Sequence, residues 1–247
     1  MTEDMKPVDE NDIMPFFCGP GNLCFNECCR DLNQALTPYD ILRLKQNLGL
    51  FSQDFLRTYT SCHGGPQSGL PVVGFKPNPA TGHACPFVTE EGCSVYPDRP
   101  ASCRMYPLAR AIARSRETGK IQEYFALIVE DHCKGFGENT NLTVRQWLDS
   151  QCVDLHNQYN DTLMELISLK NRMMPGTLAG FQSDQFYLAL YDLDTFRIQI
   201  FDRDLLAQYN VPLSVLERIR TSDEALLELG LQWVRNQLFG LEMILEA

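Results

Sequence analysis

Residues 18–30 read CGPGNLCFNECCR, a stretch with glycine, proline and four cysteines, two of them adjacent at Cys28 and Cys29. Adjacent thiols make poor disulfide partners, because a disulfide needs side chains aimed together within a narrow range of separations. They make good metal ligands, because each thiolate only has to reach an ion, so neighbours can serve one polynuclear centre or two centres packed together. We interpret eight of the ten cysteines as ligands: Cys18, Cys24, Cys28, Cys29, Cys85, Cys93, Cys103 and Cys133.

The compartment decides how ten cysteines are used. Residues 1–12 are acidic and contain no apolar run of the signal-peptide kind, and nowhere does the sequence reach the ~20 uninterrupted apolar residues of a membrane helix. We therefore expect a soluble, cytoplasmic protein with no membrane association. Cytosolic thiols stay reduced, which favours metal binding or redox chemistry over disulfides.

The charge balance argues against nucleic acid as a partner. The net charge is −11, from 32 acidic residues against 21 lysines and arginines, so a phosphate backbone would be repelled. A local basic cluster lies within the second cysteine set, and we interpret it as charge compensation for a thiolate-rich centre. Its members are Arg99, Arg104, Arg110, Arg114 and Arg116.

The cysteine-rich part of the chain contains loops, short strands and two helices. Thr37 followed by Pro38, with Gly49 after the last apolar position, predicts a helix over residues 38–48, and Ser52 is a cap for a second short helix. The segment 61–82 is mostly loop. Alternating and β-branched residues predict a strand at 72–75, a small hairpin of 87–88 with 94–96, and a longer hairpin of 108–116 with 121–130.

Past residue 137, apolar residues recur every three or four positions, a spacing that predicts helices. One long amphipathic helix is expected over residues 143–172, with Thr143 as its cap and Cys152 on its apolar stripe. Further helices are expected at 183–196 and 212–219, and a last one begins with Thr221 and Glu224 as a capping box. The fold class is thus α+β, with a metal-binding module at residues 1–137 packed against a helical region at 138–247.

The cysteine motifs also resemble a known family. The spacing Cys18-x5-Cys24-x3-Cys28-Cys29, followed by CPF at 85–87, CSVY at 93–96 and RPASCRMYP at 99–107, is similar to the YkgJ-type cysteine-cluster family, described as zinc- or iron-chelating. The resemblance covers residues 18 to about 135 and implies a metal centre. Some relatives carry a flagellin lysine N-methylase label. A radical S-adenosylmethionine enzyme would show C-x3-C-x2-C, whereas here Asp31 stands at the third position.

Iron–sulfur and zinc both use four thiolates, and the spacing separates them weakly. We favour an iron–sulfur cluster of the [4Fe–4S] type, because structural zinc sites present paired C-x2-C knuckles that this chain lacks. Zinc is the alternative. Eight thiolates can supply two four-ligand centres, or one cluster and a second metal with an open position.

Residues beside the ligands complete the candidate site. Arg30, Arg99 and Arg104 are expected to donate hydrogen bonds to thiolate or sulfide as cofactor-binding residues. The roles of Cys62, His63, His83 and His132 stay open: we interpret them as loop residues, but His83 and His132 are near enough to predicted ligands to support or bind a metal. Cys152 is interpreted as core and His156 as helix surface. The pairs Asp192/Asp194 and Asp202/Asp204 are interpreted as solvated faces rather than a catalytic dyad.

Three functions follow from these observations. The first is a metalloprotein with a redox or catalytic role toward a protein or small-molecule partner. The second is a structural zinc module for interactions, and the third a protein lysine N-methylase. Standard hydrolase and kinase signatures are absent, and the sequence leaves open whether the protein is an enzyme. We also predict that metal removal unfolds residues 18–135 before the rest.

Overall fold

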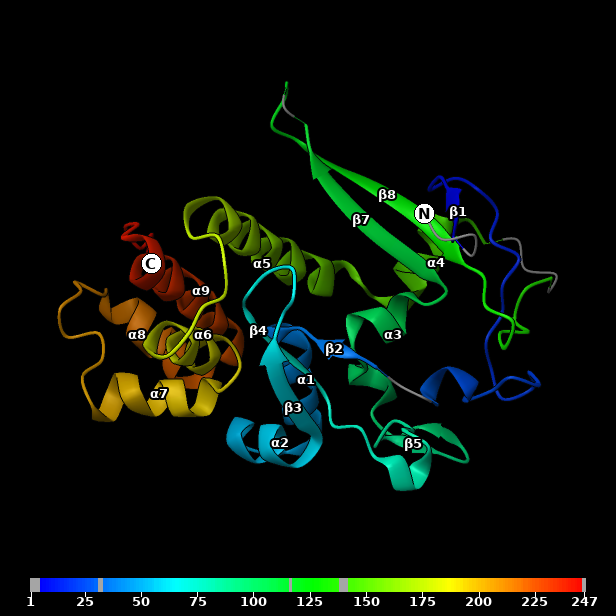
Figure 1. The fold of residues 1–247 in the computed structure, drawn as a ribbon, viewed down its shortest axis with the longest axis horizontal. Coiled ribbons are helices and arrows are strands. Elements are labelled where there is room, and N and C mark those ends of the chain that lie inside the picture. The colour runs from blue at the N-terminus through cyan, green and yellow to red at the C-terminus, as the bar shows by residue number, and fades with distance from the viewer. Residues whose placement is uncertain (1–4, 31–32, 116, 138–141, 246–247) are drawn as a thin grey trace. The chain divides into compact units, whose positions relative to one another are not determined.

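The structure is a computed structural model that describes residues 5–30, 33–115, 117–137 and 142–245 (Figure 1). Residue contacts divide the chain into two units that alternate along the sequence. Unit 1 contains Met1–Leu32 and Asn78–Asn157, and unit 2 contains Asn33–Pro77 and Gln158–Ala247. The expected division between residues 137 and 138 rests on composition and stays a prediction.

Unit 1 is built on a three-stranded antiparallel sheet of order β1-β8-β7. The strands are β1 (Met5–Val8), β7 (Leu108–Arg114) and β8 (Ile121–Ile128), and a small hairpin is formed by β5 (Val88–Thr89) and β6 (Gly92–Cys93). The helices are α3 (Ala101–Met105) and α4 (Val144–Gln151), with single 3₁₀ turns η1 (Glu27–Cys29), η2 (Pro79–Thr81) and η3 (Tyr96–Asp98). The longer predicted hairpin is confirmed, and the small one is present with different bounds, pairing residues 88–89 with 92–93 rather than 87–88 with 94–96.

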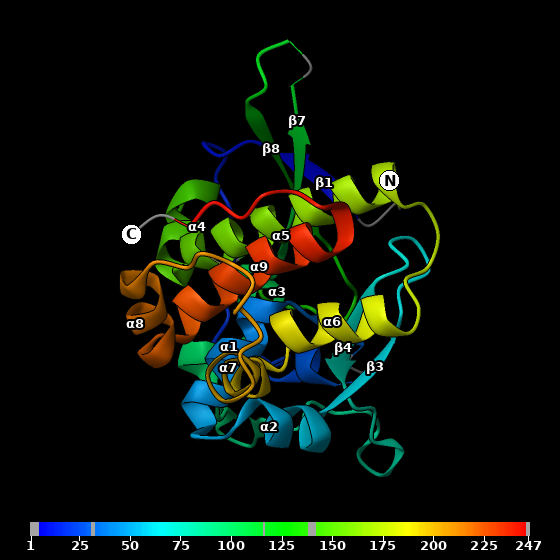
Figure 2. The same ribbon diagram turned by 90° about the vertical axis from the view of Figure 1, so that its left-hand side faces the viewer.

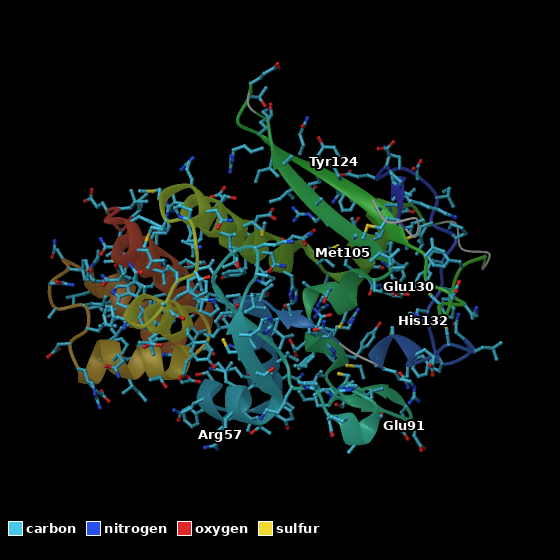
Figure 3. The ribbon with its side chains drawn as sticks, viewed as in Figure 1. Arg57, Glu91, Met105, Tyr124, Glu130 and His132 are labelled. Carbon is cyan, nitrogen blue, oxygen red and sulfur yellow. The ribbon has the colours of Figure 1, made fainter. Side chains whose placement is uncertain are left out.

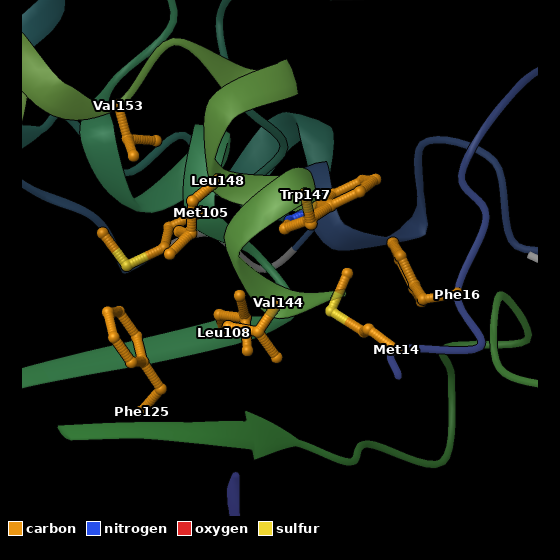
Figure 4. Close-up of a cluster of buried hydrophobic side chains, with 9 residues drawn as sticks. All are labelled: Met14, Phe16, Met105, Leu108, Phe125, Val144, Trp147, Leu148 and Val153. Carbon is orange, nitrogen blue, oxygen red and sulfur yellow. The ribbon is translucent and has the colours of Figure 1, made fainter. Parts of the chain in front are cut away.

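A cluster of apolar side chains forms the core of unit 1 (Figure 4). On α4, Val144, Trp147 and Leu148 share one face because residues three and four apart are neighbours on a helix. They pack with residues from the sheet, from α3, from the N-terminal segment and from the link after α4: Met14, Phe16, Met105, Leu108, Phe125 and Val153. Cys133 packs against this cluster, so the cysteine-rich unit also possesses a hydrocarbon core.

Unit 2 combines a second antiparallel sheet, of order β2-β4-β3, with helices. Its strands are β2 (Ala35–Leu36), β3 (Thr60–Gly64) and β4 (Pro71–Phe75). Its helices are α1 (Pro38–Leu48), α2 (Ser52–Tyr59), α6 (Phe181–Leu190), α7 (Leu193–Asp202), α8 (Leu213–Thr221) and α9 (Asp223–Phe239), while α5 (Asp154–Met173) begins in unit 1 and continues into unit 2. Sheets and helices in both units confirm the α+β class.

The packing of unit 2 centres on α9, which contacts α1, α6, α7 and α8. Where α9 meets α6 (Figure 2), a side chain at Gly230 would collide with the carbonyl oxygen of Ala189, so only glycine permits this approach. Trp233, Phe196 and Phe186 are almost completely buried there. Within the described residues, no helix combines the length and apolar composition needed to span a bilayer.

The sequence predicted α1 correctly. Thr37 forms a capping box with Asp40, Pro38 occupies the first turn, and Gly49 ends the helix at a φ of 62°. Other boundaries differ: α9 is capped by Ser222 rather than by Thr221, and the helix expected over 183–196 is two helices, α6 and α7. The polar segment of β3 was expected as loop, yet it pairs with β4 along its whole length.

The long helix expected over residues 143–172 is interrupted. Thr143 caps α4 with a capping box to Gln146, as predicted, but Cys152 ends the helix at a left-handed φ of 53°. Cys152 is exposed, not part of the core. The interruption allows Val153 to enter the apolar cluster of unit 1. His156, expected on the surface, is 4 % exposed and hence buried.

One acidic pair expected to be solvated is instead enclosed in unit 2, with Asp192 buried and Asp194 half-buried. The Lys45 ammonium lies 2.9 Å from Asp194 and 2.8 Å from Asp223, and Arg197 bridges the same two carboxylates. Asp192 accepts a hydrogen bond from the Ser52 hydroxyl at 2.6 Å. The prediction was wrong for Asp192 and Asp194, because distant cations and donors reach them, whereas Asp202 and Asp204 are exposed.

Candidate metal centre

All eight cysteines predicted as ligands belong to unit 1. They come from a loop before η1, from η1 itself, from the β5–β6 hairpin, from α3 and from the turn that follows β8. All ten cysteines lie in the described part of the chain, and none of them is in a disulfide. The eight thiols are half-buried or exposed, in contrast to the buried side chains of the apolar cluster.

The first cysteine loop is fastened to the turn around Cys133. The Phe17 amide donates to the carbonyl oxygen of Gly135 at 3.0 Å, and Phe16 forms a β-bridge with Phe136. Gly135 is necessary for this approach, because a Cβ there would meet the Phe17 carbonyl oxygen at 2.5 Å. The amide of the residue after Cys133 also donates to the Cys24 sulfur at 3.1 Å. Sequence segments more than a hundred residues apart thus meet at these thiols.

A second group of thiols is arranged around the small hairpin. The Cys85 amide donates to the carbonyl oxygen of Cys29 at 2.8 Å, and Cys93 is the register partner of Val88. The Cys85 sulfur accepts backbone hydrogen bonds from Phe87 and Val88, and the Cys93 sulfur accepts one at residue 95. Burial raises the pKa of both thiols. The backbone N–H groups aimed at sulfur stabilise its ionised form and so offset part of that rise.

Cys28 and Cys29 lie side by side in η1 with hydrogen-bonded thiols. The hydrogen bond from Cys29 lowers the pKa of Cys28 to about 7, against the opposing effect of burial. The same hydrogen bond, followed by burial, raises the pKa of Cys29. The first proton of the adjacent pair is therefore easier to remove than that of an isolated thiol, and the second is harder to remove.

The thiols raise one another's pKa values. Burial, then the negative charges of Cys28, Cys24 and Cys133, raises the pKa of Cys18 to about 11. Mutual repulsion of this kind is relieved by a cation, and soft thiolates select zinc, copper(I) or iron–sulfur clusters. In the described chain, no three His, Cys, Asp or Glu side chains are close enough as they stand to hold one metal ion. The donor set nevertheless fits a thiophilic metal by its chemistry.

Arg99 is buried and lies beside the thiols. It donates to the Tyr96 carbonyl oxygen and to the Gln151 side chain, each at 2.6 Å, and its guanidinium lies 3.8 Å from the Tyr96 ring centroid. Burial raises the pKa values of Cys18 and Cys93, and the positive charge of Arg99 opposes that rise in both. Arg99 thus provides a positive charge within reach of both groups of thiols.

The other two predicted arginines have different surroundings. Arg104 is buried and donates to the carbonyl oxygens of Arg99 at 3.1 Å and Gln151 at 3.0 Å, so it supports the backbone that surrounds Cys103. Arg30 is exposed and pairs with Glu27 at 3.0 Å. Cofactor binding by these arginines stays a prediction.

The basic cluster is not concentrated at the thiols. Arg110 pairs with Glu123 at 2.6 Å across the β7–β8 hairpin, and Arg114 donates to the carbonyl oxygen of Gly119 at 2.7 Å. Arg116 lies outside the described residues. Of the basic cluster, Arg99 is thus the residue best placed to compensate thiolate charge, since its charge opposes the rise in the pKa of two of the thiols.

Tyr106 and Glu130 adjoin the centre and were not predicted as functional residues. Tyr106 donates from its hydroxyl to Glu130 at 2.9 Å, and burial, followed by hydrogen bonds to Cys133 and Glu130, raises the pKa of this phenol. Figure 3 shows Glu130 and His132 in the segment after β8. In the sequence, Tyr106 is marked only by its place in the RPASCRMYP stretch that resembles the family.

The remaining cysteine and histidine candidates have surroundings of their own. Cys62 is on β3 of unit 2, where its charge raises the pKa values of Tyr187 and Tyr191 after the larger effect of burial. His83 adopts a left-handed φ of 59° in the loop before Cys85. His132 is exposed and lies 3.7 Å from Glu130. The sequence left the roles of these residues open, and no ligand role is assigned to them.

A family model matches residues 18–152, more than half of the chain, and its description is "CxxCxxCC: putative zinc- or iron-chelating domain". The match begins at the first predicted ligand and ends at Cys152, so it includes every predicted ligand. Comparison with curated proteins and with solved structures found no match. The motifs, the gathered thiols and this match together establish that the chain belongs to the CxxCxxCC family of zinc- or iron-chelating domains.

Proposed function

We propose that the protein is an iron–sulfur protein whose clustered cysteines bind a [4Fe–4S] cluster or a related iron centre for a redox or catalytic role. The observation that carries this proposal is the gathering of eight thiols in unit 1, where they raise one another's pKa values. Thiols arranged in this way form a site for cations. The family description supports metal chelation and leaves iron and zinc open.

Several features favour iron–sulfur over zinc. The ligands are scattered over loops, a turn, a hairpin and short helices, an arrangement that iron–sulfur clusters tolerate. When bound, an iron–sulfur cluster supplies electron transfer at a potential set by charge, hydrogen bonds to sulfur and solvent exposure. In this chain, Arg99 contributes charge, the amides of the β5–β6 hairpin contribute hydrogen bonds, and the cluster around Trp147 excludes water on one side.

A structural zinc module is the second candidate. Its support is the pair Cys85 and Cys93, whose sulfurs accept backbone amides at the two ends of a short hairpin. Such hydrogen bonds orient ligands in closed structural sites as they do in reactive ones. A zinc centre would then organise the loops of unit 1 for an interaction role.

Setting and partners follow from the same residues. Reduced thiols favour a cytoplasmic location, where the thiols stay available to metal. A net charge of −11 disfavours nucleic acid, so the partner is a protein or a small molecule. The methylase label of some relatives makes S-adenosylmethionine the first small molecule to test.

Anaerobic purification with iron, zinc and acid-labile sulfide analysis tests the proposal. Iron and sulfide in equal amounts, together with a brown colour, are the expected result. Stoichiometric zinc in a colourless protein would replace the proposal by the zinc module, because zinc is d¹⁰. Cys152→Ser is the control for the loss of one thiol and should keep the full metal content, since Cys152 is exposed and was not predicted as a ligand. Calorimetric binding of S-adenosylmethionine would direct the function toward methyl transfer.

A further inference from the structure

The eight thiols separate into two sets, and the division passes between the adjacent residues Cys28 and Cys29. We propose that the chain holds two four-thiol centres, an inference that rests on the proposed metal binding and deepens it. The first set is Cys18, Cys24, Cys28 and Cys133. The second set is Cys29, Cys85, Cys93 and Cys103.

The first set is defined by contacts between the N-terminal loop and the turn after β8. Backbone hydrogen bonds join Phe17 to Gly135, and the Lys134 amide donates to the Cys24 sulfur at 3.1 Å. The thiols whose charges act on Cys18 are Cys28, Cys24 and Cys133, all of them members of this set. These three thiols therefore lie around Cys18.

The second set is defined by contacts around the β5–β6 hairpin. The Cys85 amide donates to the Cys29 carbonyl oxygen at 2.8 Å, and the hairpin register brings Cys93 opposite Val88. Apart from its neighbour Cys28, the thiols whose charges raise the pKa of Cys29 are Cys85 and Cys103. The second set thus has its own hairpin and helix, and it meets the first at η1.

The adjacent cysteines can serve different centres because of the geometry of η1. In a 3₁₀ turn, with three residues per turn, consecutive side chains leave the axis about 120° apart. The backbone carbonyl of Cys29 accepts a hydrogen bond from Cys85, and the charges of Cys85 and Cys103 raise the pKa of the Cys29 thiol. Cys28 is affected by the charge of Glu130, which lies near Cys133 and accepts a hydrogen bond from Tyr106. The charge of Cys28 also raises the pKa values of Cys85 and Cys93 in the second set. The two centres are therefore close neighbours.

Four thiolates are the complement of one tetrahedral ion or one cubane cluster. Eight thiols in two sets therefore complete two centres without a further ligand from elsewhere. A single centre would use four of the thiols and leave the others as neighbours that repel one another.

Metal content of paired variants tests the division. The variants are Cys24→Ser in the first set, Cys93→Ser in the second, Cys24→Ser with Cys133→Ser within one set, and Cys24→Ser with Cys93→Ser across the sets. We expect each single variant to lose half of the metal per chain, the within-set double to keep the same half, and the cross-set double to lose all. Cys62→Ser and Cys152→Ser should keep the full amount.

Complete loss of metal in every single variant would overturn the division, as would full loss in the within-set double. The iron–sulfur proposal fails separately: a wild type that contains zinc without iron or sulfide refutes it, while half-loss of zinc would still support two centres. A wild type without metal refutes both. Circular dichroism verifies that the variants are folded.

A second measurement uses the wild-type protein in case a variant does not fold. During slow chelation, thiols are alkylated and identified by mass spectrometry. Cysteines of one set should become reactive together, at a rate distinct from that of the other set. A single common rate for all eight would contradict the division.

Discussion

Two groups of ionisable side chains, one in each unit, differ in how their charge is balanced. In unit 2, Asp194 and Asp223 face Lys45 and Arg197, so the carboxylates have cations of their own. In unit 1, the thiols face other thiols, and Arg99 is the cation whose charge reaches two of them.

The difference explains why only one group acts as a binding site. In a network that contains its own counter-ions, folding alone balances the charges, and removal of any one member lowers the free energy of unfolding. A set of mutually repelling acids is satisfied by an added cation, and its ordering is linked to that cation. Each unit thus predicts a different response to metal, mutation and pH.

The largest expected effect is that of metal removal. Chelation should lower amide protection in residues 18–30 and 85–103 while α6 and α9 keep theirs, because ligand binding energy, on the order of 10 kcal/mol in small zinc modules, is folding energy. Hydrogen–deuterium exchange with and without chelator measures this. Equal loss of protection in both units would contradict the comparison.

Breaking the ion network of unit 2 should come next. Lys45→Met removes a cation that both carboxylates share, and removing one partner of a buried ion network costs about 3–5 kcal/mol of unfolding free energy. Urea unfolding measures the loss, and metal content should not change. Arg57→Met is the matched control: its pair with Asp54 is exposed, so less than about 1 kcal/mol is expected. A similar loss in both variants would refute the buried network.

The apolar cluster of unit 1 should support the sheet whether or not metal is bound. Leu148→Ala removes a side chain that is 1 % exposed, and the cavity should cost about 3 kcal/mol. Thermal unfolding should show this loss in the metal-bound and the metal-free protein. Leu155→Ala is the control, since Leu155 is 47 % exposed. An effect restricted to the metal-bound protein would mean that metal, and not hydrocarbon, forms this core.

Removing the cap of α4 should have a smaller effect. Thr143→Ala loses the hydrogen bond from the Gln146 amide, which should cost about 1 kcal/mol, while Thr143→Ser keeps the hydroxyl and most of the stability. Denaturant midpoints of the two variants provide the measurement. Equal stability of alanine and serine at this position would argue against the capping box.

The smallest expected effect is a pH dependence that arises in unit 2. Burial raises the pKa of Asp223, but hydrogen bonds from Lys45 and Arg197 outweigh it, so the folded-state pKa lies below the ordinary value. The resulting stability is present above the unfolded pKa of about 3.9 and is lost as pH falls through the folded value. Asp223→Asn should flatten the unfolding free energy in this acid range. An unchanged slope would remove Asp223 as its source.

Local signals in the sequence predicted the elements that depend on them. Thr37, Pro38 and Gly49 determine α1 by capping and backbone conformation alone. The break at Cys152 was not predictable, because the apolar period continues past it and Val153 is drawn into a core assembled from distant segments. Strand β3 has a polar sequence and forms because β4 is available to pair with it.

The candidate site shows the same limit. Ligand identity could be proposed from cysteine spacing and from the family resemblance, since motifs are local. The N–H groups aimed at Cys85 and Cys93 and the contact of Tyr106 with Glu130 depend on backbone paths that no motif encodes. Arg30 illustrates the difference. It is next to Cys29 in the sequence, yet in the structure it pairs with Glu27 at the surface.

The alternation of the two units has a consequence for synthesis on the ribosome. Unit 1 begins with Met1–Leu32 but is completed only by Asn78–Asn157. At translation rates of about 5–20 residues per second, the earliest cysteines emerge roughly ten seconds before Cys133. During that interval the nascent chain presents bare thiols, so delivery of metal before completion would meet half-formed sites. Loading of the complete ligand set is therefore expected only after Cys133 has emerged.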